Sequence, residues 1–162
     1  MSYKLNTETF VTPTVIDVAV VSQTPAVNTV AYATGDVVGS LLTFEGAALS
    51  GKTLIQAVGL NIKSVQTAAF DLVLFNANPS ASTFTNNEAF AVHTDDKEKV
   101  CGVIHITDLT NLGSNFSYGQ AKNEAYPISL VGTALYGVLV SRGTPTLLST
   151  SDVTITVRLL RN

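Results

Sequence analysis

The chain has 162 residues, of which 46% are apolar and only 13% are charged, about half of the roughly 25% charged residues usual in globular proteins. The net charge of −3 with no basic cluster argues against nucleic acid as a partner, the single cysteine excludes an internal disulfide, and no apolar run reaches the length of a membrane span. The length predicts one domain with a sizeable core, and the weakly charged surface indicates extensive contact with other protein subunits.

The N-terminal segment is polar. Residues 1–13 lack the apolar stretch of a secretory signal, so we expect synthesis in the cytosol and interpret the segment as an arm. The single folded domain is then expected to cover residues 14–162.

Short segments rich in β-branched residues follow, separated by Gly, Pro, Asn and Asp. The expected strands are residues 14–22, 37–44, 54–65, 70–77, 100–107, 127–131, 134–141 and 152–160. Residues 78–88 read as a loop, and the polar residues 108–125 are the best place for a short helical turn. About eight strands without an amphipathic helix predict an all-β fold, an antiparallel two-sheet β-sandwich that is jelly-roll-like.

One stretch matches a catalytic motif. In GAALSGKT, residues 46–53, Gly46, Gly51, Lys52 and Thr53 occupy the defined positions of the phosphate-binding P-loop. That motif binds phosphate only where a strand precedes the loop and a helix follows it, because the helix N-terminus and the loop amides hold the phosphates. The residues that follow therefore decide between a nucleotide-binding enzyme and a turn.

Those residues favour a strand. Val58, Leu60 and Ile62 alternate with polar or small residues, and a helix here would place Gly59 in its interior. A possible second nucleotide-binding element, VIHITD ending at Asp108, is interrupted by polar residues. We interpret GAALSGKT as a turn between two neighbouring antiparallel strands, with the lysine side chain in solvent.

Both histidines and the only cysteine lie close together in the sequence. Cys101 and His105 would share a strand face but lie about 13 Å apart, too far to bind one zinc ion. His93 could meet Asp95 or Asp96 in a turn, but two or three loop ligands make a weak metal signal. We interpret TDDKEK as a solvated charged hairpin loop and Cys101 as a small core residue.

No other constellation predicts chemistry. The acidic residues fall mostly at strand ends and in loops, and Asp17 and Asp71, within strands, are expected to face outward or an interface. The chain has no Trp to form a sugar-stacking platform. We therefore assign no catalytic, cofactor or metal residue and expect no enzymatic activity and no cofactor.

Three stretches carry a family resemblance. AYATGDVVGSLLTFEGA (31–47), FDLVLFNANPSASTFTNNEAF (70–90) and the closing segment 133–162 with SRGTPT resemble small virion proteins of tailed bacteriophages. Those proteins show a similar order of a G-D-V-V-G strand, a D-L-V-L-F strand before an N-P loop, and a final S-R-G-T-P-T strand pair.

The resemblance implies a β-sandwich structural component of the virion, with no functional residues to carry over. The leading expectation is a capsid decoration or cement protein, made in the host cytoplasm, that binds the major capsid protein on the capsid surface and acts as a homotrimer. The alternatives are a tail, neck or fibre component, and a carbohydrate-binding β-sandwich module, against which the absence of Trp argues.

Overall fold

Nine strands build two antiparallel sheets in the computed structural model, which describes residues 17–161. The expected arm, residues 1–13, and the first residues of the strand expected at 14–22 lie outside this range. The strands are β1 (Asp17–Gln23), β2 (Leu42–Phe44), β3 (Lys52–Ile62), β4 (Phe70–Phe75), β5 (Val100–Ile106), β6 (Leu109–Asn111), β7 (Ser117–Ser129), β8 (Leu135–Ser141) and β9 (Val153–Arg161). A 3-10 helix, η1 (Thr94–Lys99), precedes β5.

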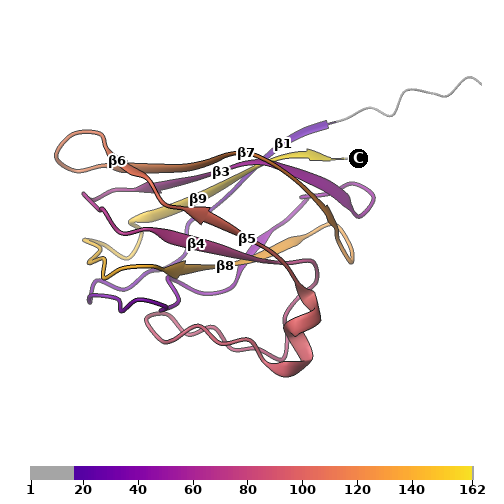
Figure 1. The fold of residues 1–162 in the computed structure, drawn as a ribbon, viewed down its shortest axis with the longest axis horizontal. Helices are drawn as coiled ribbons and strands as arrows, with labels where there is room; N and C mark the ends of the chain where they lie inside the picture. The colour runs from indigo at the N-terminus through magenta and orange to yellow at the C-terminus, as the bar shows by residue number, and fades with distance from the viewer. Residues whose placement is uncertain (1–16, 162) are drawn as a thin grey trace, which may run out of the picture.

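The strand order confirms the sandwich. The five-stranded sheet runs β1-β9-β3-β7-β6 and the four-stranded sheet runs β2-β8-β4-β5, and Figure 1 shows the two sheets as stacked layers. Strand β1 pairs with β9, β2 with β8, β3 with β7 and β4 with β5. These nested pairs alternate between the two sheets, as in a long hairpin wrapped around the core, which is the jelly-roll arrangement.

The main core lies between the sheets and comes from strand alternation. In β3 the residues Val58, Leu60 and Ile62 are buried as predicted, and in β9 the inward set includes Ile155 and Val157. Burial of these Val, Leu, Ile and Phe side chains, each contributing about 1.5–3 kcal/mol, is the main source of stability.

A third layer covers the outer face of the four-stranded sheet. The segment 76–99 leaves β4, crosses this face and returns to β5, and Figure 1 shows it beneath the lower sheet. Phe84 packs against Phe75 of β4 and against Phe90, with ring centroids 5.7 Å apart in both pairs. Together with Val73, Val138 and Val140, these residues form a second, smaller core. This explains why β4 and most of β8 are buried on both faces.

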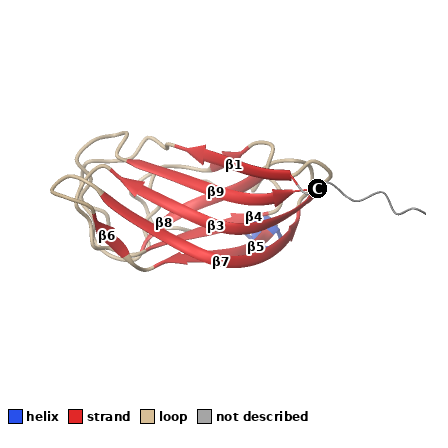
Figure 2. Ribbon diagram, turned by 90° about the horizontal axis from the view of Figure 1, so that it is seen from above, coloured by secondary structure: helices blue, strands red, loops and turns tan. Residues whose placement is uncertain are grey.

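The outer face of the five-stranded sheet is not crossed by any segment of residues 17–161. Figure 2 looks onto this sheet and shows β1, β9, β3 and β7 side by side with no segment crossing them. Residues 17–161 thus cover the outer face of the four-stranded sheet and leave that of the five-stranded sheet uncovered.

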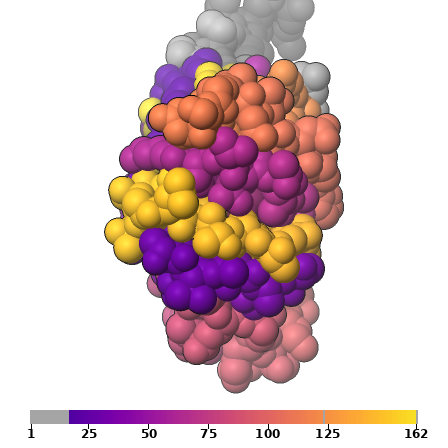
Figure 3. Space-filling model, turned by 90° about the vertical axis from the view of Figure 1, so that its left-hand side faces the viewer, coloured from indigo at the N-terminus to yellow at the C-terminus, as the bar shows by residue number. Residues whose placement is uncertain are grey.

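Loops distant in sequence pack together at the end of the sandwich where β1 finishes and β9 begins. The Val27 amide donates to the Thr150 carbonyl at 2.9 Å, and the Tyr32 amide donates to the Pro145 carbonyl at 3.0 Å. Figure 3 views this end and shows the segments around residues 24–41 and 142–152 in contact.

Two predicted elements were wrong. Residues 108–125 form no helical turn but the β6–β7 hairpin and most of β7. In the first half of β7, Gln120 and Lys122 face outward while Gly119 and Ala121 face the core, so the segment carries little apolar signal. Residues 94–99 form η1 rather than an irregular loop.

Candidate functional site

The P-loop-like stretch does not form a phosphate site. Gly46 and Gly51 adopt positive φ values of 67° and 79°, a conformation that favours glycine, and strand β3 begins directly at Lys52. No helix N-terminus follows the loop, which removes the element that would hold a phosphate. The lysine is exposed, as predicted.

The turn itself differs from the prediction in one respect. It was expected to join neighbouring strands, but β2 and β3 belong to different sheets, so residues 45–51 cross from one sheet to the other. The crossover is held by hydrogen bonds to the loop before β8: the Ala48 amide donates to the Thr133 carbonyl at 3.1 Å, and the Leu130 amide donates to the Gly51 carbonyl at 2.7 Å.

Cys101 and His105 do not share a face, contrary to the prediction. The pairing of β4 with β5 shifts register between Leu74 and Phe75, and this bulge changes the alternation of β5. Cys101 therefore packs against the main core, as a small core residue was expected to do. Burial raises the pKa of its thiol to about 11, so the group is protonated at neutral pH and is a poor nucleophile.

The face of β5 opposite to the core carries His105. Its Nδ1 lies 2.7 Å from Oδ1 of Asp71, whose other oxygen accepts a hydrogen bond of 2.6 Å from Nε of Arg142. Asp71 points outward from its sheet as expected, but it is buried beneath these partners. Within residues 17–161, His105 has no hydrogen bond to a hydroxyl or thiol, so the pair lacks the nucleophile that a hydrolytic triad requires.

The acidic segment before β5 is solvated at Thr94, Asp95, Lys97 and Glu98, as predicted, but it is anchored at Asp96. Asp96 is fully buried and accepts hydrogen bonds of 2.7 Å from the Lys99 ammonium and from the Ser82 hydroxyl. His93 caps η1 by accepting from the Asp95 amide at 3.3 Å. Over residues 17–161, no group of three His, Cys, Asp or Glu side chains could hold a metal ion.

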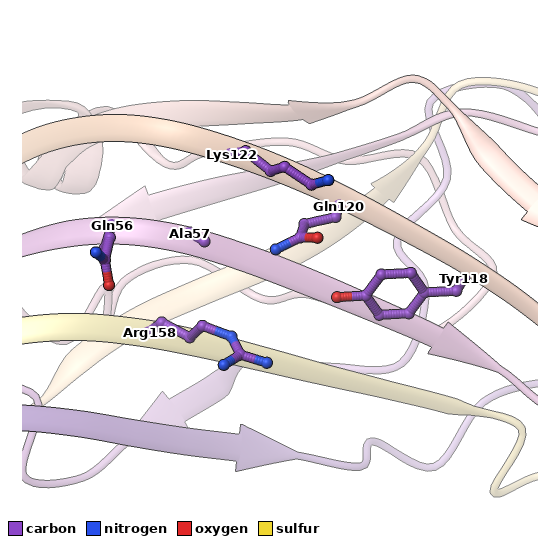
Figure 4. A pocket seen from close by; sticks show the side chains of 6 residues that line it. All are labelled: Gln56, Ala57, Tyr118, Gln120, Lys122 and Arg158. Carbon is purple, nitrogen blue, oxygen red and sulfur yellow. The ribbon is translucent and has the colours of Figure 1, made fainter.

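A polar groove lies on the outer face of the five-stranded sheet. It consists of two adjoining hollows of about 400 Å³ and 360 Å³ that share lining residues. The lining residues are Gln56, Ala57, Asp108, Thr110, Tyr118, Gln120, Lys122 and Arg158. Figure 4 shows that six of them come from the three central strands β7, β3 and β9.

Strand register positions the groove residues. Ala57 lies opposite Lys122 on one side and Arg158 on the other, so the two cationic residues flank a small residue in a row across three strands. Gly59, two residues further along β3, lies opposite Gln120. The small side chain of Ala57 between two long ones creates the floor of the groove, and Gly59 leaves room for the ring of Tyr118.

A β-bulge in β3 also shapes the groove. Both pairings of β3 shift register between Ile55 and Ala57, so Gln56 is an extra, exposed residue at the edge of the groove. None of these residues was assigned to a site from the sequence. The alternation of residues on β3 was visible, but only the end of β7, within the strand expected at residues 127–131, was predicted.

An apolar surface lies at the end of the sandwich where β3 begins. Leu49 is 56% exposed and Val131 is 78% exposed, and the hydrogen bonds between their loops hold these two loops side by side. We call this surface, formed by Leu49 and Val131, the apolar end. At the sheet edge nearby, β1 exposes Val18 and Val20.

Comparison of the chain with protein-family models, with curated proteins and with solved structures found no match. Over residues 17–161, no helix is long and apolar enough to cross a membrane. The function is therefore argued from the fold and its surfaces.

Proposed function

We propose that this protein is a structural component of a bacteriophage virion, a capsid decoration or cement protein that binds the major capsid protein and stabilises the head. The observation that carries the proposal is the apolar end. Two large aliphatic side chains, Leu49 and Val131, stand exposed on adjacent, hydrogen-bonded loops, and exposed apolar side chains of this kind are characteristic of surfaces that bury on association.

The rest of the fold is compatible with that role. A cement protein requires a rigid body and contact surfaces, and no reaction chemistry. The covering of the four-stranded sheet by segment 76–99 gives a three-layered, firmly packed body, and a charged fraction of 13% leaves little electrostatic barrier to close contact.

We also propose self-association into a homotrimer. Strand β1 forms one edge of the five-stranded sheet and exposes Val18 and Val20. An exposed strand edge with apolar side chains is a ready surface for another chain. Light scattering of the purified protein measures the mass directly, and Val18→Lys with Val20→Lys is expected to give monomers.

The experiment for the main proposal uses phage shells assembled without this protein. Added wild-type protein is expected to co-sediment with the shells and raise their melting temperature. Leu49→Ser with Val131→Ser should abolish both effects, whereas Leu148→Ser, at a residue that is 74% exposed at the opposite end, should leave them unchanged.

Absence of both co-sedimentation and stabilisation by the wild type would refute the proposal. Copy number per virion separates it from the alternative of a tail, neck or fibre component, because a decoration protein is present in hundreds of copies and a tail or neck protein in few.

A further inference from the structure

The polar groove is unrelated to the apolar end and calls for its own explanation. It lies on the outer face of the five-stranded sheet, which no segment of residues 17–161 covers. Each of its two hollows is of the size that accommodates a small ligand, roughly 300–1,000 Å³. Ala57 lies at its floor, and most of its walls are long polar side chains.

The cations of the groove are unneutralised. Neither Lys122 nor Arg158 forms an ion pair with another residue of the described chain, although every other described arginine does. They occupy register positions on either side of Ala57, roughly two strand spacings of about 4.8 Å apart. A single carboxylate above Ala57 could accept hydrogen bonds from both cations.

The remaining lining groups narrow the ligand class. Gln56 and Gln120 supply neutral donors and acceptors, and Asp108 and Thr110 line the adjoining hollow. Two cations and one carboxylate give a local charge of +1. This charge suits a ligand with one negative group and several hydroxyls, and Asp108 would repel a polyanion.

Tyr118 provides an apolar surface beside these polar groups. A Cβ atom built at Gly59 would lie 3.1 Å from the Tyr118 hydroxyl and 3.6 Å from its ring, so the tyrosine lies across the glycine. Figure 4 shows its hydroxyl directed along β3 toward the centre of the groove. A ring with a polar tip can contact the C–H face of a sugar and bond its hydroxyls.

We propose that the polar groove binds an acidic saccharide, with the carboxylate of one sugar held by Arg158 and Lys122 and neutral hydroxyls bonded by Gln120, Gln56 and Asp108. The positive local charge favours the acidic sugar over a neutral one. The mixture of amides, a carboxylate and a phenol favours a polyhydroxylated ligand over an apolar one or a phosphate polymer.

The test is titration of the full chain with a hyaluronan disaccharide, which carries one glucuronic acid, and with the neutral N-acetylglucosamine dimer, by calorimetry and by amide chemical shifts. We expect the acidic probe to bind, the neutral probe to bind at least ten-fold more weakly, and shifts to centre on Tyr118 and Gln120. Arg158→Ala is expected to weaken binding of the acidic probe about ten-fold, as loss of a charge-assisted hydrogen bond predicts.

Matched variants keep the result interpretable. Lys97→Ala removes an exposed cation from η1, far from the groove, and should leave binding unchanged. Ala57→Leu fills the floor without altering charge and should abolish binding. Circular dichroism verifies that each variant is folded.

Four outcomes would overturn the proposal. The first is no binding of the acidic probe at millimolar concentration. The second is equal binding of both probes. The third is unchanged binding by Arg158→Ala. The fourth is tighter binding of a poly-glutamate peptide than of the saccharide, which would assign the groove to an acidic protein partner.

Discussion

The Lys99 ammonium lies 2.7 Å from Oδ1 of Asp96, a carboxylate without exposed surface at the end of the segment that covers the four-stranded sheet. Ser82, from the beginning of the same segment, donates to the other carboxylate oxygen. Asp96 thus joins both ends of the covering segment, and burying it without partners would be strongly unfavourable.

This arrangement predicts acid sensitivity. Burial alone raises the pKa of Asp96, but the hydrogen bonds from Lys99 and Ser82 outweigh it and leave that pKa below its usual value of 3.8. A lowered native pKa stabilises the fold above the unfolded-state pKa, and this contribution is lost as the pH falls through the native value. Asp96→Asn should therefore lower the urea midpoint at pH 7, and the difference from wild type should shrink below about pH 4.

Asp95→Asn is the matched control, because the Asp95 side chain is 76% exposed. Its urea midpoint should follow the wild type at both pH values. A constant difference between Asp96→Asn and wild type from pH 7 to pH 3 would contradict the linkage.

We expect Phe84, in the second core, to contribute strongly to the stability of the fold. Its ring contacts Phe75 and Phe90, and truncation of a buried Phe to Ala typically costs 3–5 kcal/mol. We expect Phe84→Ala to lower the free energy of unfolding by about 3 kcal/mol and to increase protease cleavage within residues 76–93. Phe84→Leu, which keeps most of the volume, should show a smaller loss. Cleavage elsewhere in the chain without cleavage of this segment would argue against its role as a cover.

Cys101 is expected to react slowly in the native state. Its raised pKa, about 11, leaves little thiolate at pH 8, and the thiolate is the reactive form. Alkylation by iodoacetamide should accelerate as the pH rises toward 11 and should be rapid at pH 8 in denaturant. Because the native pKa is raised, the protonated thiol stabilises the fold below the unfolded pKa, and this contribution is lost as the pH rises through the native value. Fast native alkylation at pH 8 would disprove the assignment.

We expect substitution of Lys52, in the P-loop-like turn, to change neither stability nor nucleotide binding. Because β3 follows the turn directly, Lys52→Ala should leave the free energy of unfolding within about 0.5 kcal/mol of wild type, as for other surface substitutions. Calorimetry with ATP and Mg²⁺ should show no heat of binding for either protein. A binding heat present in the wild type and lost in the variant would restore the nucleotide-binding interpretation.

The sequence by itself determined the fold class and most of the strands. Alternation of Val58, Leu60 and Ile62 placed β3 correctly, and the strand expected at residues 152–160 corresponds to β9. Such patterns are readable because side chains on a strand alternate between core and solvent, so local spacing carries the information. Residues 117–122 of β7 were not predicted as a strand because the inward Ser117, Gly119 and Ala121 are small and Gln120 and Lys122 are polar.

Only the tertiary structure decided which residues meet. Three contacts depend on residues that lie far apart in the sequence. Asp96 is buried beneath Ser82, and Asp71 contacts His105 and Arg142. Lys122, Ala57 and Arg158 form a row across three strands. Register and bulges set these pairings, and a one-residue shift moves a side chain to the other face of the sheet. Composition and local spacing do not determine which distant strands pair. The groove and its charged residues could therefore be identified only from the assembled sheet.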